Sequence, residues 1–178
     1  MSKVANRQPV LKPQDLYVLF ALLSRRGGSA TYPELAQQTG LALSAVHAAL
    51  KRAVVSRLVM FQDRRPVVLK AQLREFVLFG AKYVFPPIWG TLTRGVPTAY
   101  AAAPLNRLIE PGSEPVPVWP HAEGEVRGLS LAPLYPSVPP AALKDEGLYA
   151  LLALFDAVRS GRARERDAAQ KLLEEFFQ

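Results

Sequence analysis

Hydrophobic residues near the start of the chain recur at helical spacing. They fall three and four positions apart, at Leu16, Leu19, Phe20 and Leu23. Residues at this spacing share one face of a helix, and Pro13 suits the first helical turn, where its missing amide would be unpaired anyway. The pattern predicts a helix from Pro13 to about Arg25-Arg26-Gly27-Gly28, where glycine favours a C-cap.

Two shorter helices and a hairpin are predicted next. A helix over about residues 33–38 stops at Gly40, and another covers about residues 43–57. Two β-prone runs, residues 58–61 and 66–69, flank the polar stretch Gln62-Asp63-Arg64-Arg65. This arrangement predicts a hairpin with a basic tip.

The stretch over residues 32–51, YPELAQQTGLALSAVHAALK, carries the residue types that a helix-turn-helix requires at fixed spacing. Two short helices that cross steeply need a small residue at their contact, here Ala36. Four residues later the turn needs a left-handed conformation, which glycine adopts without steric cost, here Gly40. Six residues further on, the β-branched Val46 fills the core between the helices. These features together predict a helix-turn-helix.

A fourth helix is predicted at about residues 71–83, and the composition of the sequence changes after it. Most of the chain's 16 prolines fall in residues 86–140, so long helices are mostly excluded there. Short strands are expected at residues 116–119 and 125–131, with one helical turn near residues 105–109.

Two amphipathic helices are predicted at the C-terminal end. The first starts at Asp145, and Gly161 separates it from a second helix at residues 162–177. Together they predict a helical hairpin, whose apolar faces either form core within the chain or pair with a second copy. We expect a flexible arm at residues 1–11, a DNA-binding domain at residues 12–85 and an α+β domain for dimerisation or partner binding at residues 86–178.

The charge of the chain is divided unequally. Residues 1–85 carry 13 Lys and Arg against 4 Asp and Glu, whereas residues 86–178 carry 9 against 11. A basic first half suits a polyanion such as nucleic acid. The chain has no cysteine, which excludes disulfides and thiolate metal sites. Its apolar runs are too short for a membrane span and its first residues lack a signal-peptide pattern, so we expect a cytoplasmic protein without membrane contact.

The pattern TYPELA…GL…V…AL…R…LV over residues 31–59 resembles the winged helix-turn-helix regulators of bacteria, MarR-like in the broad sense. The resemblance covers about residues 12–83. It implies a three-helix core with a β-wing, the third helix lying in the major groove of double-stranded DNA and the wing against a minor groove or backbone. The expected fold class is α+β, with an N-terminal winged helix-turn-helix, a proline-rich segment with short strands and a C-terminal helical hairpin.

The residues expected to contact DNA lie on the third helix and the hairpin. Ser44 and His47 suit base edges, whereas basic residues suit phosphates, namely Lys51, Arg52, Arg57, Arg64 and Arg65. Ala42 opens the third helix where Ser or Thr is usual, and two alanines on the outer face limit direct readout. Winged helices also dock proteins, but basic residues on both helix and hairpin favour DNA.

Four arginines lie around the glycine break near the C-terminal end, namely Arg159, Arg162, Arg164 and Arg166. They form either a solvated helix face with local ion pairs or a docking surface for an acidic partner. The segment GVPTAYAAAPL at residues 95–105, behind an N-terminal winged helix, gives a weaker resemblance to antitoxins of abortive-infection systems. That resemblance implies a nucleotidyltransferase toxin as partner and repression of the protein's own operon.

Enzyme signatures are absent from the sequence, which contains no GxxxxGK[ST], GxGxxG, GxSxG or HExxH motif. His121, Glu123 and Glu125 alternate, but a solvent-exposed strand edge is favoured over a metal or acid–base cluster. We therefore expect no catalytic activity, no cofactor and no metal. The leading hypothesis is a homodimeric, sequence-specific transcriptional repressor. The alternative is an antitoxin-like module that neutralises a protein partner.

Overall fold

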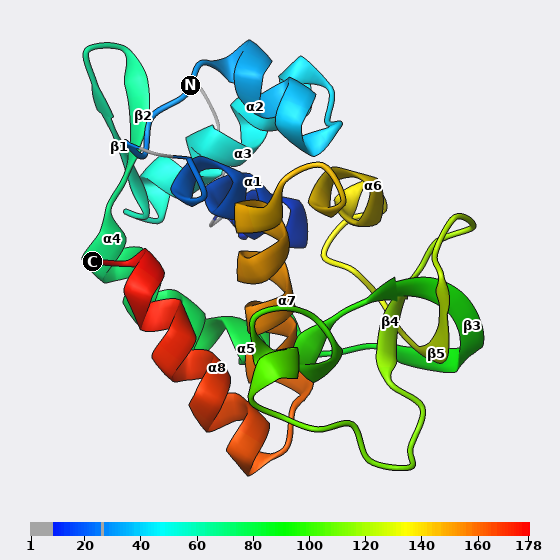
Figure 1. Ribbon diagram of the computed structural model, residues 1–178. Coiled ribbons are helices and arrows are strands. Elements are labelled where there is room, and N and C mark those ends of the chain that lie inside the picture. The colour runs from blue at the N-terminus through cyan, green and yellow to red at the C-terminus, as the bar shows by residue number, and fades with distance from the viewer. Residues whose placement is uncertain (1–8, 26) are drawn as a thin grey trace, which may run out of the picture.

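The computed structural model describes residues 9–25 and 27–178, so most of the arm predicted for residues 1–11 lies outside it. Three helices come first, α1 (Pro13–Leu23), α2 (Tyr32–Thr39) and α3 (Leu43–Val55). An antiparallel hairpin of β1 (Val59–Gln62) and β2 (Arg65–Val68) follows and stands out from the helices in Figure 1. The order of these elements confirms the secondary structure predicted for this part of the chain.

The turn between α2 and α3 is made by Gly40, whose φ of 67° lies in the left-handed region that the sequence pattern requires. Helix α2 begins with a capping box, in which the Glu34 carboxylate accepts the backbone N–H of Thr31 at 2.6 Å. Helix α3 starts after Ala42 without a side-chain cap, as expected. Val46 is fully buried where α3 contacts α1 and α2.

The hairpin turn consists of Asp63 and Arg64, whose φ values are 49° and 63°. Two consecutive positive φ angles match the twist of the flanking strands in a two-residue hairpin loop. At the other end of the hairpin, Ser29 forms an isolated bridge with Val67. The segment before α2 is therefore tied to β2.

The fourth predicted helix is present but irregular. It consists of α4 (Lys70–Glu75), a π-helical turn η1 (Phe76–Gly80) and α5 (Ala81–Val84). A π-turn inserts one extra residue and widens the helix. The chain then turns into the proline-rich segment at Pro86 and Pro87.

Three strands of the proline-rich segment close into a small barrel, β3 (Trp89–Pro97), β4 (Pro117–Pro120) and β5 (Val126–Leu131). Strand β3 pairs antiparallel with both others, which pair parallel with each other. Glycines permit this closure, because a Cβ on Gly95 would lie 2.1 Å from the Trp119 carbonyl oxygen. Strands β4 and β5 confirm the two predicted strands, whereas the longest strand, β3, was not predicted.

Two 3-10 turns connect β3 to β4, η2 (Ala99–Ala101) and η3 (Leu105–Arg107), and the second confirms the predicted helical turn. Residues 121–125, which contain the alternating His and Glu residues, form a loop rather than a strand. The short helix α6 (Val138–Ala142) was not predicted because two of its five residues are proline. Proline is compatible with the first turn of a helix, where these two residues lie.

Helices α7 (Glu146–Ser160) and α8 (Ala163–Phe176) confirm the predicted C-terminal pair and pack against each other. Asp145 caps α7, because its carboxylate accepts the backbone N–H of Leu148 at 2.9 Å. In Figure 1, α7 runs through the centre of the molecule, between α8 and the barrel. Helix α7 also contacts α1 and α6.

The hydrophobic core is continuous between the two halves of the chain. Phe20 of α1 and Phe155 of α7 pack with their ring centroids 5.7 Å apart, and both side chains are fully buried. One cluster of buried residues extends from Leu16 to Leu173. The fold class is α+β, as predicted. No helix in residues 9–25 or 27–178 is long and apolar enough to cross a membrane.

Candidate nucleic-acid interface

The outer face of α3 presents three of the predicted contact residues together. Ser44, His47 and Lys51 are exposed and follow one another at helical spacing. All three line a shallow groove of about 700 Å³, whose other walls include Tyr32 of α2 and Phe61 of β1. The structure therefore brings the helix and the first strand of the hairpin to one surface.

An aromatic stack orients His47 in this groove. The imidazole lies flat on the Tyr32 ring, with centroids 3.9 Å apart and an interplanar angle of 7°. Phe61 continues the stack, with its ring centroid 6.3 Å from that of Tyr32. Stacking on Tyr32, whose ring also contacts Phe61, restricts the rotamers of His47. The sequence analysis did not predict that Tyr32 and Phe61 belong to this surface. The position of Tyr32 before a proline indicates only a helix start, and the position of Phe61 indicates only a strand.

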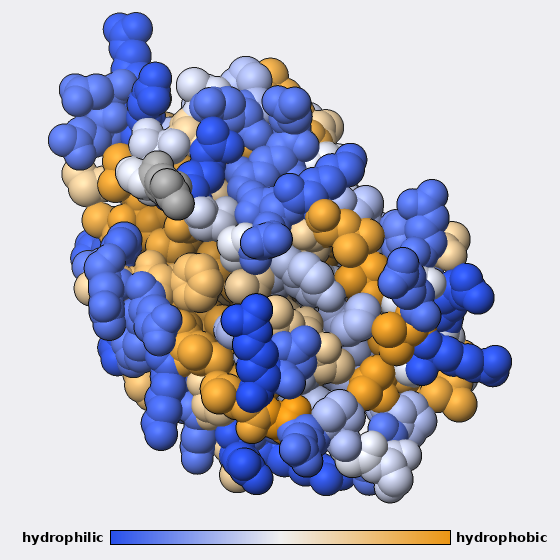
Figure 2. Space-filling view, viewed as in Figure 1, coloured by the Kyte–Doolittle hydropathy of each residue, from blue (hydrophilic) through white to orange (hydrophobic). Residues whose placement is uncertain are grey.

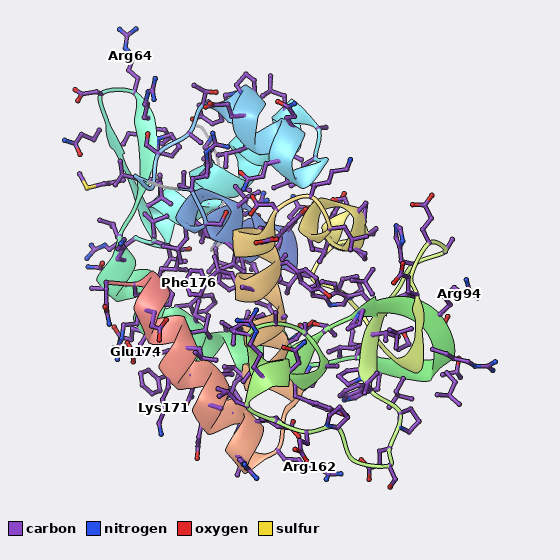
Figure 3. The ribbon with its side chains drawn as sticks, in the orientation of Figure 1. Arg64, Arg94, Arg162, Lys171, Glu174 and Phe176 are labelled. Atoms are coloured by element: carbon purple, nitrogen blue, oxygen red, sulfur yellow. The ribbon has the colours of Figure 1, made fainter. Side chains whose placement is uncertain are left out.

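The tip of the hairpin carries the two predicted arginines. Arg64 points away from the protein in Figure 3, and the tip is hydrophilic throughout in Figure 2. Arg65 is exposed at the start of β2. The pKa of Glu34 is lowered chiefly by the hydrogen bonds from Thr31, with smaller contributions from Arg25 and Arg65. The positive charge of Arg65 therefore reaches the start of α2.

Arg52 does not belong to the exposed face, and its predicted phosphate contact is contradicted. Its guanidinium binds the buried carboxylate of Asp15 with two hydrogen bonds, at 2.7 Å from Nε and 2.6 Å from Nη2. Asp15 has no exposed surface and also caps the start of α1 by accepting the backbone N–H of Lys12. These bonds raise the pKa of Arg52 further. Arg52 fastens α3 to α1 because a buried carboxylate requires a paired charge.

Arg57 lies just beyond the end of α3 and outside the groove. It has a φ of 58°, which is uncommon for a residue with a side chain. It lines a separate cavity of about 530 Å³ with Leu11, Phe76 and Phe79. The structure therefore does not bring Arg57 together with Ser44 and His47.

The four C-terminal arginines fall into two groups. Arg164 and Arg166 are exposed on α8, and Arg162 forms an exposed ion pair with Glu114 at 2.7 Å. Arg159 is only 4% exposed, so its predicted role in binding a partner is contradicted. Its guanidinium is fully engaged inside the protein, by the Asp156 carboxylate at 2.7 Å and the Ala132 carbonyl at 2.7 Å.

Asp156 is the centre of a buried polar network between α7 and the barrel. One carboxylate oxygen accepts hydrogen bonds from Thr98 Oγ at 2.7 Å and from Trp119 Nε1 at 2.6 Å, while the other accepts from Arg159. Thr98 precedes the η2 turn, Trp119 is in β4, and Arg159 is three residues further along α7. Both carboxylate oxygens of Asp156 therefore accept hydrogen bonds. The network therefore connects α7 to the barrel.

The second half of the chain contacts the turn between α2 and α3 directly. Ser137 Oγ donates to the Thr39 carbonyl at 2.6 Å, and the same carbonyl accepts from the Tyr17 hydroxyl at 2.9 Å. One residue earlier, Gln38 Nε2 donates to the Asp145 carboxylate at 2.7 Å. The position of the turn is therefore fixed by residues that precede α6 and α7.

Among the described residues, no group of three His, Asp or Glu side chains is placed to hold a metal ion. Comparison with known proteins found no protein family, no curated protein and no solved structure that matches this chain.

Proposed function

We propose that the chain is a sequence-specific DNA-binding transcriptional regulator whose residues 12–85 form a winged helix-turn-helix. Helix α3 is the recognition helix and the β1–β2 hairpin is the wing. The protein acts as a homodimeric repressor, and its two recognition helices occupy successive half-sites of one operator.

The observation that carries this proposal is the shared surface of α3 and the hairpin. Ser44, His47 and Lys51 line one groove on α3, and the arginines of the hairpin tip extend positive charge beyond it. A helix of this kind fits the major groove of DNA, where short polar side chains reach base edges. Lys51, Arg64 and Arg65 are the phosphate contacts, because flexible cations on the flanks position a helix without reading sequence.

The test is the salt dependence of binding to a fluorescent DNA duplex, measured by anisotropy. The triple variant Lys51→Ala, Arg64→Ala, Arg65→Ala is expected to bind more weakly at every salt concentration. Its slope of log K against log salt should be shallower by about 2–3, since each lost phosphate contact removes roughly 0.9.

A matched control removes the same charge from a different surface. The variant Arg164→Ala, Arg166→Ala, Lys171→Ala changes three exposed cations of α8. It should bind the duplex like the parent if α3 and the hairpin form the interface. Equal losses in the two triple variants would contradict the proposal, because they would show binding driven by net charge alone.

Sequence preference is tested separately, by selecting duplexes from a randomised pool with the full-length protein. One enriched motif is expected, and His47→Ala should change that motif because the stacked imidazole reads a base edge. A pool that stays random after several rounds would contradict sequence-specific binding.

A second candidate function, capture of an acidic protein partner, is favoured by the exposed face of α8. Leu108 is 56% exposed and shares a shallow groove with Arg164, Lys171 and Leu172, so two cations, against the one acid Asp167, lie beside an apolar contact. In the antitoxin version of this role, the partner is a nucleotidyltransferase toxin encoded by a neighbouring gene. Coexpression of that neighbour with the Arg164→Ala, Arg166→Ala, Lys171→Ala variant tests it, since loss of copurification is expected.

A further inference from the structure

A cavity lies in the second half of the chain, away from the α3 surface. Its volume is about 460 Å³, within the range of small-molecule sites. It is lined by residues of the barrel, of the loop before β4 and of the junction between α7 and α8. No lining residue comes from α1, α2, α3 or the hairpin.

Two aromatic residues form the walls of this cavity. Trp89 opens β3 and is 44% exposed, and Tyr100 lies in the η2 turn and is partly buried. Ile109 and Leu129 add apolar surface between them. A half-exposed tryptophan and a tyrosine in the lining of one cavity give flat apolar surface for a planar ligand.

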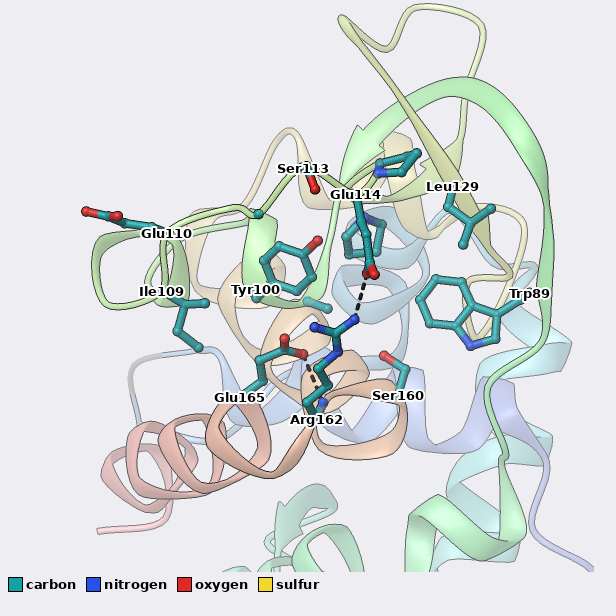
Figure 4. Close-up of a pocket in the computed structure, with 14 residues that line it drawn as sticks. Trp89, Tyr100, Ile109, Glu110, Ser113, Glu114, Leu129, Ser160, Arg162 and Glu165 are labelled. Atoms are coloured by element: carbon teal, nitrogen blue, oxygen red, sulfur yellow. Dashed lines mark hydrogen bonds and ion pairs between the residues drawn. The ribbon is translucent and has the colours of Figure 1, made fainter.

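The ionised groups of the cavity carry a net negative charge. Glu114 and Glu165 face Arg162, whereas Glu110 points away in Figure 4. Burial raises the pKa of the Tyr100 hydroxyl, and Glu165 and Glu114 raise it further against the opposing effect of Arg162. The potential at the Tyr100 ring therefore favours a cation.

The guanidinium of Arg162 already fills the position that such a cation would take. In Figure 4 it points toward Glu114 between Tyr100 and Trp89, and its Nη2 lies 2.7 Å from the carboxylate. The two side chains are 75% and 72% exposed, so the ion pair is weakly held in solvent. Arg162 is the residue before α8, and its backbone N–H donates to Glu165, so its side chain can leave without unwinding the helix.

We propose that this cavity binds a small organic cation with a planar apolar body, such as a protonated amidine or amine. The ligand's charge replaces the Arg162 guanidinium on Glu114, and its body lies between Trp89 and Tyr100. The two rings offer apolar surface to the body of the ligand, while the carboxylates attract its charge. The proposal is independent of DNA binding.

The test uses two probes of nearly equal shape and opposite charge, benzamidine and benzoate, titrated into the full-length protein by calorimetry. Benzamidine is expected to bind with a Kd in the millimolar range, and benzoate is expected not to bind. Binding of benzoate alone, or of neither probe, would overturn the proposal.

Three single variants separate a cation site from an anion site. Arg162→Ala should tighten benzamidine binding, because the competing internal cation is gone, whereas Glu114→Gln should weaken it by up to about fivefold, as expected for one lost exposed charge pair. Arg164→Ala, an exposed neighbour that does not line the cavity, should leave binding unchanged. Weaker binding of benzamidine to Arg162→Ala would overturn the proposal. All three positions are exposed, so the variants are expected to fold like the parent.

Discussion

The hydroxyl of Ser137 donates a hydrogen bond of 2.6 Å to the carbonyl oxygen of Thr39, although 98 residues separate the two in the chain. Thr39 ends α2 and is followed by the turn glycine, Gly40. The Tyr17 hydroxyl donates to the same carbonyl. One backbone oxygen at the turn is therefore held by both halves of the protein.

Removing these two donors should show a strong interaction between them. Ser137→Ala is expected to lower the free energy of unfolding by about 1 kcal/mol, because Tyr17 still satisfies the carbonyl. The double variant Ser137→Ala, Tyr17→Phe leaves a buried carbonyl without a partner and should lose more than the sum of the single variants. Urea denaturation measures all three, and strict additivity would argue against a shared acceptor.

Substitutions of Gly40 should lower the stability of the protein. The loss should be larger for residues that adopt a left-handed backbone less easily. The φ of Gly40 is 67°, and a Cβ there would meet Ser137 Cβ at 3.4 Å, an ordinary contact. Gly40→Asn should therefore cost least, Gly40→Ala about 1–2 kcal/mol, and the β-branched Gly40→Val most. Thermal denaturation gives the order, and a melting temperature of Gly40→Val equal to that of the parent would remove the helix-turn-helix interpretation.

Arg52 should behave as a structural residue. Arg52→Ala leaves the buried Asp15 carboxylate without its charged partner and is expected to cost about 3–5 kcal/mol. The double variant Arg52→Met, Asp15→Leu replaces the pair by apolar side chains and should recover most of that loss. If Arg52→Ala unfolds like the parent in denaturant but binds DNA more weakly, the assignment of Arg52 to the protein interior is wrong.

Arg159 and Arg162 lie three residues apart and should respond in opposite ways. Arg159→Ala leaves Asp156 buried with two neutral donors only, so a loss of about 3–5 kcal/mol is expected. Arg162→Ala removes half of an exposed ion pair and should change stability by less than about 1 kcal/mol. Denaturation followed by far-ultraviolet circular dichroism compares the two variants directly, and comparable losses would contradict the burial of Arg159.

Much of the secondary structure could be predicted from the sequence because it depends on local pattern. Helical spacing located α1, α3 and α7, and the glycine between α2 and α3 marked the turn. Strand β3 escaped prediction because its first four residues are exposed, which removes the alternation of buried and exposed positions. The pairing of β3 with both other strands depends on tertiary structure. Glycines allow the close approach of the strands, but their presence in the sequence does not predict the pairing.

The site residues were predicted less well, because charge on a helix does not reveal which face is covered. Ser44, His47 and Lys51 lie together as the helical spacing suggests, whereas Arg52 and Arg159 bind buried acids. A usable signal existed, since Asp15 and Asp156 are single acids within otherwise apolar helical stretches. Such acids require a basic partner once the helix is buried.

An isolated fragment of residues 1–85 should fold poorly, although its length and its own helices suggest an independent unit. Residues 15–23 of α1 are all buried, and α7 contacts α1 through the Phe20–Phe155 pair. Removing α7 exposes that apolar surface to water, at about 25 cal/mol per Å². Circular dichroism and amide-proton NMR of the fragment should show weakened cooperativity relative to the full chain. A sharp thermal transition at the parent's temperature would contradict this expectation.

Because α7 packs on α1, recombination between the two halves of the chain is expected to disturb the core. A crossover near residue 86 would join an α1 shaped for Phe155 to a foreign helix, and the hybrid would carry a mismatched core. Exchange is better tolerated at exposed loops such as the one around Gly112, where added side chains meet no neighbour. Substitutions at the exposed positions of α3 avoid this mismatch, because Ser44, His47 and Lys51 do not belong to the shared core.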